Sequence, residues 1–143
     1  MPSRPHLSTA LRNIVIERAQ GRCEYCQSRA DFATETFAVD HIVPLSLGGK
    51  TESENLALAC SGCNSRKYNR QLVPDPTDGD LVSLYNPHQQ DWAQHFRWSE
   101  DYALVIGVTP TGRATVSDLK LYRLGLRNMR LLLYQVGKQP PQA

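Results

Sequence analysis

Four cysteines form two Cys-x-x-Cys pairs, Cys23 with Cys26 and Cys60 with Cys63, and they account for every cysteine in the chain. Two such pairs match a tetrahedral site of four thiolates, the ligand set that zinc takes in closed sites that do no chemistry. Disulfides are disfavoured because no export signal precedes the pairs. We therefore expect structural Zn²⁺, with a redox pair or unpaired thiols as the alternatives.

A second set of side chains with chemical potential lies among the cysteines: Asp40, His41 and Asn64. Phosphodiester hydrolysis requires a base that activates water and a cation that offsets the developing charge. An imidazole with an unperturbed pKa near 6.5 is largely neutral at pH 7, so His41 is a candidate base. Asp40 and Asn64 offer hard oxygen ligands, which suit Mg²⁺ or Mn²⁺.

Nearby polar residues are suited to support this set. Asn55 lies on the second predicted strand, where its amide can accept from or donate to the backbone of the histidine and hold the loop. Arg66, Lys67 and Arg70 follow the last cysteine, and their positive charge suits contacts with phosphate oxygens. We expect Asn55 to be a structural brace and the three basic residues to bind nucleic acid.

The elements that must position these residues follow from local patterns. Ser8 is a candidate N-cap for an amphipathic helix over residues 9–20, which Gly21 ends. Residues 37–43 and 55–59 have the composition of strands, and a helix is expected to begin at Asn64. Adjacent strand residues point to opposite faces, so the first strand must end or twist at Asp40–His41.

The segment 73–80 is acidic and rich in proline and glycine, which predicts a linker. After it, residues 96–98 and 103–108 are expected to form a hairpin, followed by a turn at 109–112. Apolar residues at spacings of three and four predict a helix over 113–136, which Gly125 is expected to divide in two. Trp92, Phe96 and Trp98 are expected to form a small core, with a base-stacking platform as the alternative.

Charge is uneven along the chain. The net charge is only +2, but the segment 113–138 contains six basic residues and one acidic residue. Lys120, Arg123, Arg127 and Arg130 recur at helical spacing and predict a basic stripe on one helix face. The stripe fits either DNA contact or a solvated surface, and the C-terminal half fits a DNA-binding attachment, a dimer surface or a packing support.

The motifs together resemble a known family. Arg22-Cys23-x-x-Cys26, Asp40-His41-Ile42-x-Pro44, Gly48-Gly49, Asn55-Leu56 and Cys60-x-x-Cys63-Asn64-x-x-Lys67 occur in that order. This order resembles the HNH endonucleases of the zinc-bearing ββα-metal type, over about residues 22–70. The resemblance implies His41 as general base, Asp40 and Asn64 as ligands of the catalytic cation, Asn55 as the structural asparagine, and zinc on the four cysteines. Asn64 departs from the histidine of the three-letter pattern, which favours Mg²⁺ or Mn²⁺ there.

The expected fold class is α+β: a ββα-metal (HNH) module stapled by a four-cysteine zinc site, with an N-terminal helix and a C-terminal hairpin-plus-helix extension. The expected boundaries are 1–72 for the nuclease module, 73–80 for the linker and 81–143 for the extension. The expected function is a divalent-metal-dependent DNA endonuclease acting on duplex DNA; the alternative is a zinc-stabilised DNA-binding module without catalysis. No apolar run reaches the roughly 20 residues of a membrane span, and a cytoplasmic location is expected, with the oligomeric state left open.

Overall fold

The structure is a computed structural model and describes residues 7–141, so the outermost residues of the expected module and extension lie outside it. Helix α1 (Thr9–Arg18) begins as predicted, because the hydroxyl of Ser8 accepts a hydrogen bond from Leu11 N at 3.1 Å. Gly21 follows its end with φ of +68°, a conformation that favours glycine. No helix within the described residues is long and apolar enough to cross a membrane.

The ββα unit consists of β1 (Ala38–His41), β2 (Leu56–Ala59) and α2 (Ser61–Lys67). The two strands pair antiparallel, with Asp40 opposite Ala57 and His41 opposite Leu56. Short 3-10 turns at Leu45–Leu47 and Ser53–Asn55 lie in the connection between them. The predicted strand–loop–strand–helix order is confirmed.

The predicted start of α2 at Asn64 is wrong, because the helix begins three residues earlier. Its N-cap is Cys60, whose sulfur accepts a hydrogen bond from Cys63 N at 3.4 Å. Serine, threonine, aspartate and asparagine are the usual N-caps, so a cysteine in that position is not read as a helix start from sequence. Asn64 therefore lies inside the helix and does not cap it.

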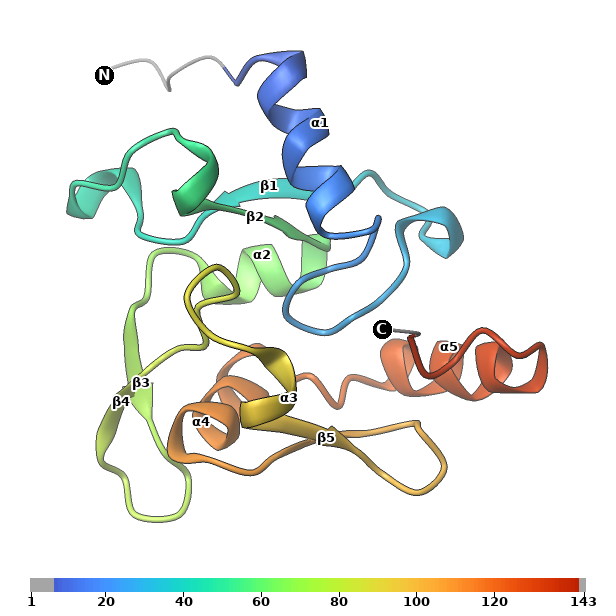
Figure 1. Ribbon diagram of the computed structural model, residues 1–143. Helices are drawn as coiled ribbons and strands as arrows, with labels where there is room; N and C mark the ends of the chain where they lie inside the picture. Colours follow the sequence, from blue (N-terminus) through green and yellow to red (C-terminus); the bar gives the residue numbers. More distant parts are fainter. Residues whose placement is uncertain (1–6, 142–143) are drawn as a thin grey trace.

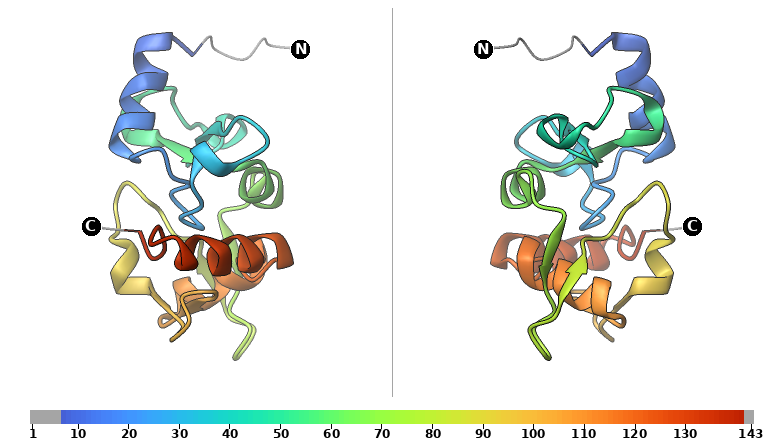
Figure 2. Two further views of the ribbon diagram at one scale, coloured as in Figure 1. Left: turned by 90° about the vertical axis from the view of Figure 1, so that its right-hand side faces the viewer. Right: turned by 90° about the vertical axis from the view of Figure 1, so that its left-hand side faces the viewer.

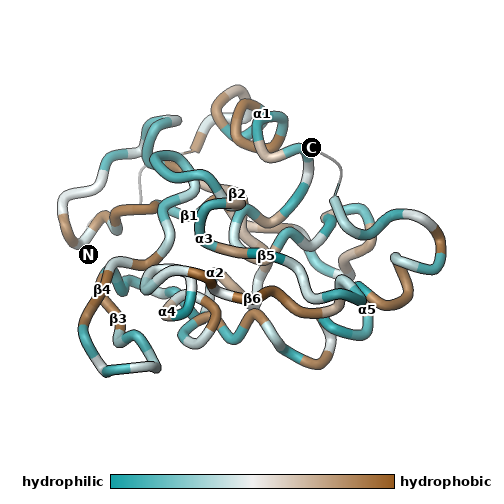
Figure 3. The backbone as a smooth tube through the Cα atoms, turned by 60° about the horizontal axis from the view of Figure 1, so that its bottom comes forward, coloured by the Kyte–Doolittle hydropathy of each residue, from teal (hydrophilic) through white to brown (hydrophobic). Residues whose placement is uncertain are grey.

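Residues 73–80, expected to be a linker, belong to a β-hairpin. Strands β3 (Leu72–Pro74) and β4 (Leu81–Ser83) pair antiparallel, and the turn between them is mainly hydrophilic (Figure 3). Asp75 at the start of the turn is buried and forms an ion pair with Arg113 at 2.8 Å. The proline and glycine residues therefore mark an ordered turn that is held to the C-terminal half.

The predicted second hairpin is confirmed as β5 (Phe96–Trp98) and β6 (Val105–Gly107), which follow the short helix α3 (Trp92–His95). The ring centroid of Trp92 lies 5.1 Å from that of Phe96 and 5.2 Å from that of Trp98. Phe96 is buried in the main core, and both tryptophans pack against that core. These contacts favour the core role of the three rings over a base-stacking platform.

The C-terminal helical segment has two helices, α4 (Pro110–Leu119) and α5 (Leu124–Gln135). The expected turn at 109–112 is the start of α4, where the hydroxyl of Thr109 accepts from Gly112 N at 3.0 Å. The break between the helices occurs at Lys120, with φ of +49°, and not at Gly125, which lies inside α5. The prediction of two helices is confirmed, but the predicted position of the break between them is wrong.

Helix α2 lies between the β1–β2 hairpin and the C-terminal elements, as Figures 1 and 2 show from three directions. One buried cluster crosses both sequence halves. It joins Val15, the four cysteines and Tyr25 to Tyr85, Phe96, Leu119 and Leu121. The division into a module at 1–72 and an extension at 81–143 stays a prediction, but the main core belongs to both.

Candidate functional site

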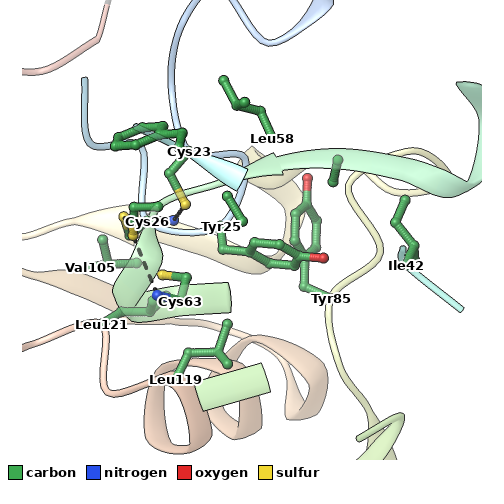
Figure 4. Close-up of a cluster of buried hydrophobic side chains, with 14 of the residues drawn as sticks. Cys23, Tyr25, Cys26, Ile42, Leu58, Cys63, Tyr85, Val105, Leu119 and Leu121 are labelled. Carbon is green, nitrogen blue, oxygen red and sulfur yellow. Dashed lines mark hydrogen bonds between the residues drawn. The ribbon is translucent and has the colours of Figure 1, made fainter. Parts of the chain in front are cut away.

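The four cysteines are buried and converge on one point. Their sulfur atoms all lie within 4.8 Å of one another, and those of Cys26 and Cys60 are 3.7 Å apart. Four zinc–sulfur bonds of about 2.3 Å in a tetrahedron place sulfurs about 3.8 Å apart, whereas a disulfide requires about 2.05 Å. The cluster therefore fits zinc and indicates a structural zinc site; Figure 4 shows Cys23, Cys26 and Cys63 close together, with Tyr25 beside them.

Each cysteine pair forms a tight turn, here called the first knuckle (23–26) and the second knuckle (60–63). In each turn a backbone N–H points at a sulfur, from Cys26 to Cys23 at 3.5 Å and from Cys63 to Cys60 at 3.4 Å. Burial raises the pKa of the Cys23 thiol well above its usual range, whereas hydrogen bonds from neighbouring thiols lower that of Cys60. Zinc, when bound, supplies the positive charge that keeps all four sulfurs as thiolates.

The first knuckle is attached to β2 by Glu24. Its backbone N–H donates to Leu58 O at 2.9 Å, and its carboxylate accepts from Leu58 N at 2.8 Å. The second knuckle continues directly from β2 through Cys60. Both knuckles are therefore fixed to the same strand, which explains how residues 34 positions apart meet at one metal.

Asp40, the predicted ligand of the catalytic cation, is 7 % exposed and lies on the buried face of β1. Its Oδ2 accepts a hydrogen bond from the Tyr25 hydroxyl at 2.9 Å and forms an ion pair with Lys67 Nζ at 3.1 Å. Burial raises the pKa of Asp40, and the Lys67 ammonium opposes that rise. Oδ1 takes part in neither contact.

Lys67 was predicted to bind phosphate, and the structure corrects this. Its side chain is 1 % exposed, and its ammonium donates to the carbonyl oxygens of His41 and Ile42, each at 3.2 Å, besides pairing with Asp40. A buried carboxylate requires a nearby cation, and a lysine on the adjacent helix supplies one. Lys67 is thus an internal partner of the site and not part of the surface.

His41 is the last residue of β1, so the strand ends at the Asp40–His41 pair as predicted. Its Nε2 lies 2.9 Å from the hydroxyl of Thr51, in the loop between the strands. The two neighbouring side chains have different surroundings: the carboxylate faces α2 and Tyr25, and the imidazole faces the loop. Alternation along a strand produces this arrangement.

Asn55 braces the loop that follows His41. Its Oδ1 accepts from Val43 N at 2.8 Å, and its Nδ2 donates to the carbonyl oxygens of Val43 at 3.0 Å and Lys50 at 2.9 Å. Gly49 makes this packing possible, since a Cβ there would lie 1.8 Å from Val43 O. The amide therefore holds the loop, but its partners are the backbone groups of Val43 and Lys50 and not the predicted backbone of His41.

The remaining predicted residues lie on or just after α2. Asn64 is half-buried and three positions before Lys67, so it lies on the helix face that approaches Asp40. Arg66 is half-buried and donates to Gly62 O at 3.2 Å. Arg70 is more exposed and pairs with Asp118 of α4 at 3.0 Å. Phosphate binding by Arg66 and Arg70 stays a prediction.

The predicted basic stripe at Lys120, Arg123, Arg127 and Arg130 does not form, because the helix breaks within it. Arg130 is 4 % exposed and donates to the carbonyl oxygens of Ala103 at 3.1 Å, Leu121 at 2.9 Å and Cys26 at 3.1 Å. Arg123 reaches the second knuckle. Of the three roles open for the C-terminal half, these contacts favour packing support.

Sequence reasoning missed Tyr25 and the structural roles of Arg123 and Arg130. Tyr25 occupies an unspecified position inside a Cys-x-x-Cys pair, so its bond to Asp40 leaves no signal in the pattern. The two arginines had the spacing of a surface stripe, and only the path of the chain turns them inward. Their partners include the sulfurs of Cys60 and Cys63 and the carbonyl oxygen of Cys26, all of which are far away in sequence.

A ββα unit closed by four cysteines, with an Asp-His pair at the strand end, defines a zinc-stapled module of the ββα-metal class. Residues 23–70 match the family model described as HNH endonuclease. This segment, called the HNH segment below, contains both knuckles, and its similarity to the family suggests a nuclease or nucleic-acid-binding role. A search of curated proteins found no match to the chain.

Proposed function

We propose that this protein is a divalent-metal-dependent DNA endonuclease that hydrolyses phosphodiester bonds in duplex DNA. The observation that carries the proposal is the packing of α2 against the end of β1 inside the HNH segment. Because of this packing, the helix that contains Asn64 contacts the Asp40 carboxylate through Lys67, at 3.1 Å. Two hard oxygen ligands and a histidine thus come from the β1–α2 corner.

In this proposal His41 is the general base that takes a proton from the attacking water. The Thr51 hydroxyl, 2.9 Å from His41 Nε2, holds the imidazole ring. The hydrogen bonds of Asn55 keep the following loop in place. Asp40 and Asn64 would hold Mg²⁺ or Mn²⁺, which supplies positive charge against the charge that develops on the phosphate. Arg66 and Arg70 would contact neighbouring phosphates.

Tyr25 and Lys67 keep the Asp40 carboxylate in one orientation in this scheme. Both bind Oδ2, so a cation can approach through Oδ1 without the loss of either contact. Because the lysine already neutralises the carboxylate, we expect moderate cation affinity. We also propose a cytoplasmic location.

The test is cleavage of supercoiled plasmid with Mg²⁺ or Mn²⁺, and with EDTA as the negative control. His41→Ala should lower the rate at least about 100-fold, the usual loss for a general base, while zinc content and melting temperature stay unchanged. His88→Ala is the matched control, since this histidine is exposed and outside the HNH segment. Equal cleavage by His41→Ala would remove the base assignment.

The alternative is a zinc-stabilised DNA-binding module without catalysis. The four-cysteine cluster alone would support it, because a structural zinc site needs no neighbouring Asp-His pair. If the wild-type protein binds duplex DNA but cleaves no DNA form with any divalent cation, the alternative replaces the nuclease proposal.

A further inference from the structure

Arg123 lies in the link between α4 and α5 and extends to the second knuckle. Its Nη2 lies 3.6 Å from the sulfur of Cys60 and 3.6 Å from that of Cys63, within the range of N–H···S hydrogen bonds. Its Nη1 donates to Leu119 O at 2.5 Å, which holds the guanidinium from the other side. The side chain therefore has a fixed position between the end of α4 and two cysteine sulfurs.

Gly62, between these two cysteines, makes room for the guanidinium. A Cβ at this position would lie 2.8 Å from Arg123 Nη2. Glycine is less favourable than alanine in a helix, and Gly62 lies in α2 without a left-handed φ that would require glycine. A side chain at position 62 would therefore require the Arg123 guanidinium to shift from its place beside the two sulfurs.

Charge explains why this contact matters. Zinc with four thiolates has a net charge of −2, and a buried negative charge is costly without hydrogen bonds or a cation. Cys23 and Cys26 receive their hydrogen bonds within or beside the first knuckle, from Cys26 N and from the Ser28 hydroxyl. For Cys63, the donor found among residues 7–141 is Arg123, from an element 60 positions away.

We propose that Arg123 is a positioning residue of the zinc centre, which slows zinc loss and shields the sulfurs of Cys60 and Cys63 from electrophiles. The proposal does not depend on nuclease activity. It gives the C-terminal half a specific role, because metal retention by the HNH segment then depends on one arginine outside that segment. Neutralised and hydrogen-bonded thiolates are weaker nucleophiles, and partners of metal ligands typically contribute 10–100-fold to metal affinity.

The experiment measures zinc transfer from the purified, zinc-loaded full chain to a colorimetric chelator. Arg123→Gln should release zinc at least about tenfold faster than wild type, and Arg123→Lys should be intermediate because it keeps the charge. Arg127→Gln, an exposed arginine on α5, should release zinc at the wild-type rate. Limited alkylation with N-ethylmaleimide should modify Cys60 and Cys63 first in Arg123→Gln.

A second variant tests the proposal without removal of the arginine. Gly62→Ala should displace the guanidinium and accelerate zinc release, although alanine favours the helix. If zinc release is faster while the melting temperature is unchanged, the cause is loss of the Arg123–sulfur contact and not a general loss of stability. If Gly62→Ala releases zinc at the wild-type rate, the proposal is overturned, even if Arg123→Gln fails to fold.

Discussion

The four-cysteine cluster and the Asp40 site both bury negative charge, but they obtain the compensating positive charge from different places. Asp40 pairs with Lys67 inside the ββα unit, 27 positions along the chain and within the HNH segment. The cysteines of the second knuckle contact Arg123, which lies beyond that segment. The proposed catalytic site is thus electrostatically self-contained, whereas the zinc site depends on the C-terminal half.

The largest effect is expected from loss of a zinc ligand. Cys60→Ser removes a zinc ligand but leaves a hydroxyl that can still cap α2, so the variant isolates the loss of the thiolate. Structural zinc contributes on the order of 10 kcal/mol, about as much as the whole stability of a typical domain. We expect no cooperative thermal transition by circular dichroism and less than one zinc per chain. Ser61→Ala, at the exposed neighbouring position, should resemble wild type; normal melting of Cys60→Ser would contradict a structural role for zinc.

Loss of the cation at the other site should have the next largest effect. Lys67→Met leaves the Asp40 carboxylate buried without its partner, which should cost about 3–5 kcal/mol of unfolding free energy. Urea denaturation measures this loss, and Arg66→Met on the same helix is the control. Near-wild-type stability of Lys67→Met would show that the pair contributes little.

The same variant tests whether Asp40 accepts a metal ion. Mg²⁺ should raise the melting temperature of Lys67→Met more than that of wild type, because the metal then supplies the missing positive charge. An Asp40→Asn, Lys67→Met double variant should lose this response. An identical response in all three proteins would contradict Asp40 as a ligand.

A smaller effect is expected where the two sites meet. Tyr25→Phe removes the hydroxyl that binds Asp40 at 2.9 Å but leaves both neighbouring cysteines intact. Hydrogen bonds to charged groups contribute about 1.5–3 kcal/mol, so we expect a loss near 2 kcal/mol with a full complement of zinc. Zinc loss in Tyr25→Phe would instead mean that the tyrosine belongs to the zinc site.

A second buried carboxylate, Asp75, provides a pH-dependent comparison of modest size. Hydrogen bonds from Arg113 and from the Thr77 backbone lower its pKa to about 2, below the value near 3.9 of an unfolded chain. Its stabilising contribution is complete above about pH 4 and is lost as the pH falls towards 2. Asp75→Asn should be less stable than wild type at pH 6, and the difference in unfolding free energy between the two proteins should narrow below pH 4. A pH-independent gap in urea unfolding would contradict this assignment.

Much of the ββα unit could be predicted from sequence because its signals are local. The cysteine spacing, the Asp-His pair before Pro44 and the β-branched residues all act within a few positions. The start of α2 could not be predicted, because a cysteine sulfur caps it. The break at Lys120 also has no local signal, since it depends on a non-glycine residue with a positive φ.

The roles of Lys67, Arg123 and Arg130 were beyond sequence reasoning for a different reason. A basic residue at helical spacing is compatible with solvent, phosphate or a buried partner, and only tertiary packing decides which. Arg130 bonds the carbonyl of Cys26 across 104 positions. Such contacts follow from the path of the whole chain and not from any motif.

The distance in sequence between the second knuckle and Arg123 has a consequence during synthesis. The last zinc ligand is translated 60 residues before the arginine that contacts it. At about 5–20 residues per second, the ribosome needs roughly 3–12 s to add them. For those seconds each nascent chain can hold metal without its guanidinium partner, so cellular zinc supply and thiol oxidants would act most strongly on newly made protein.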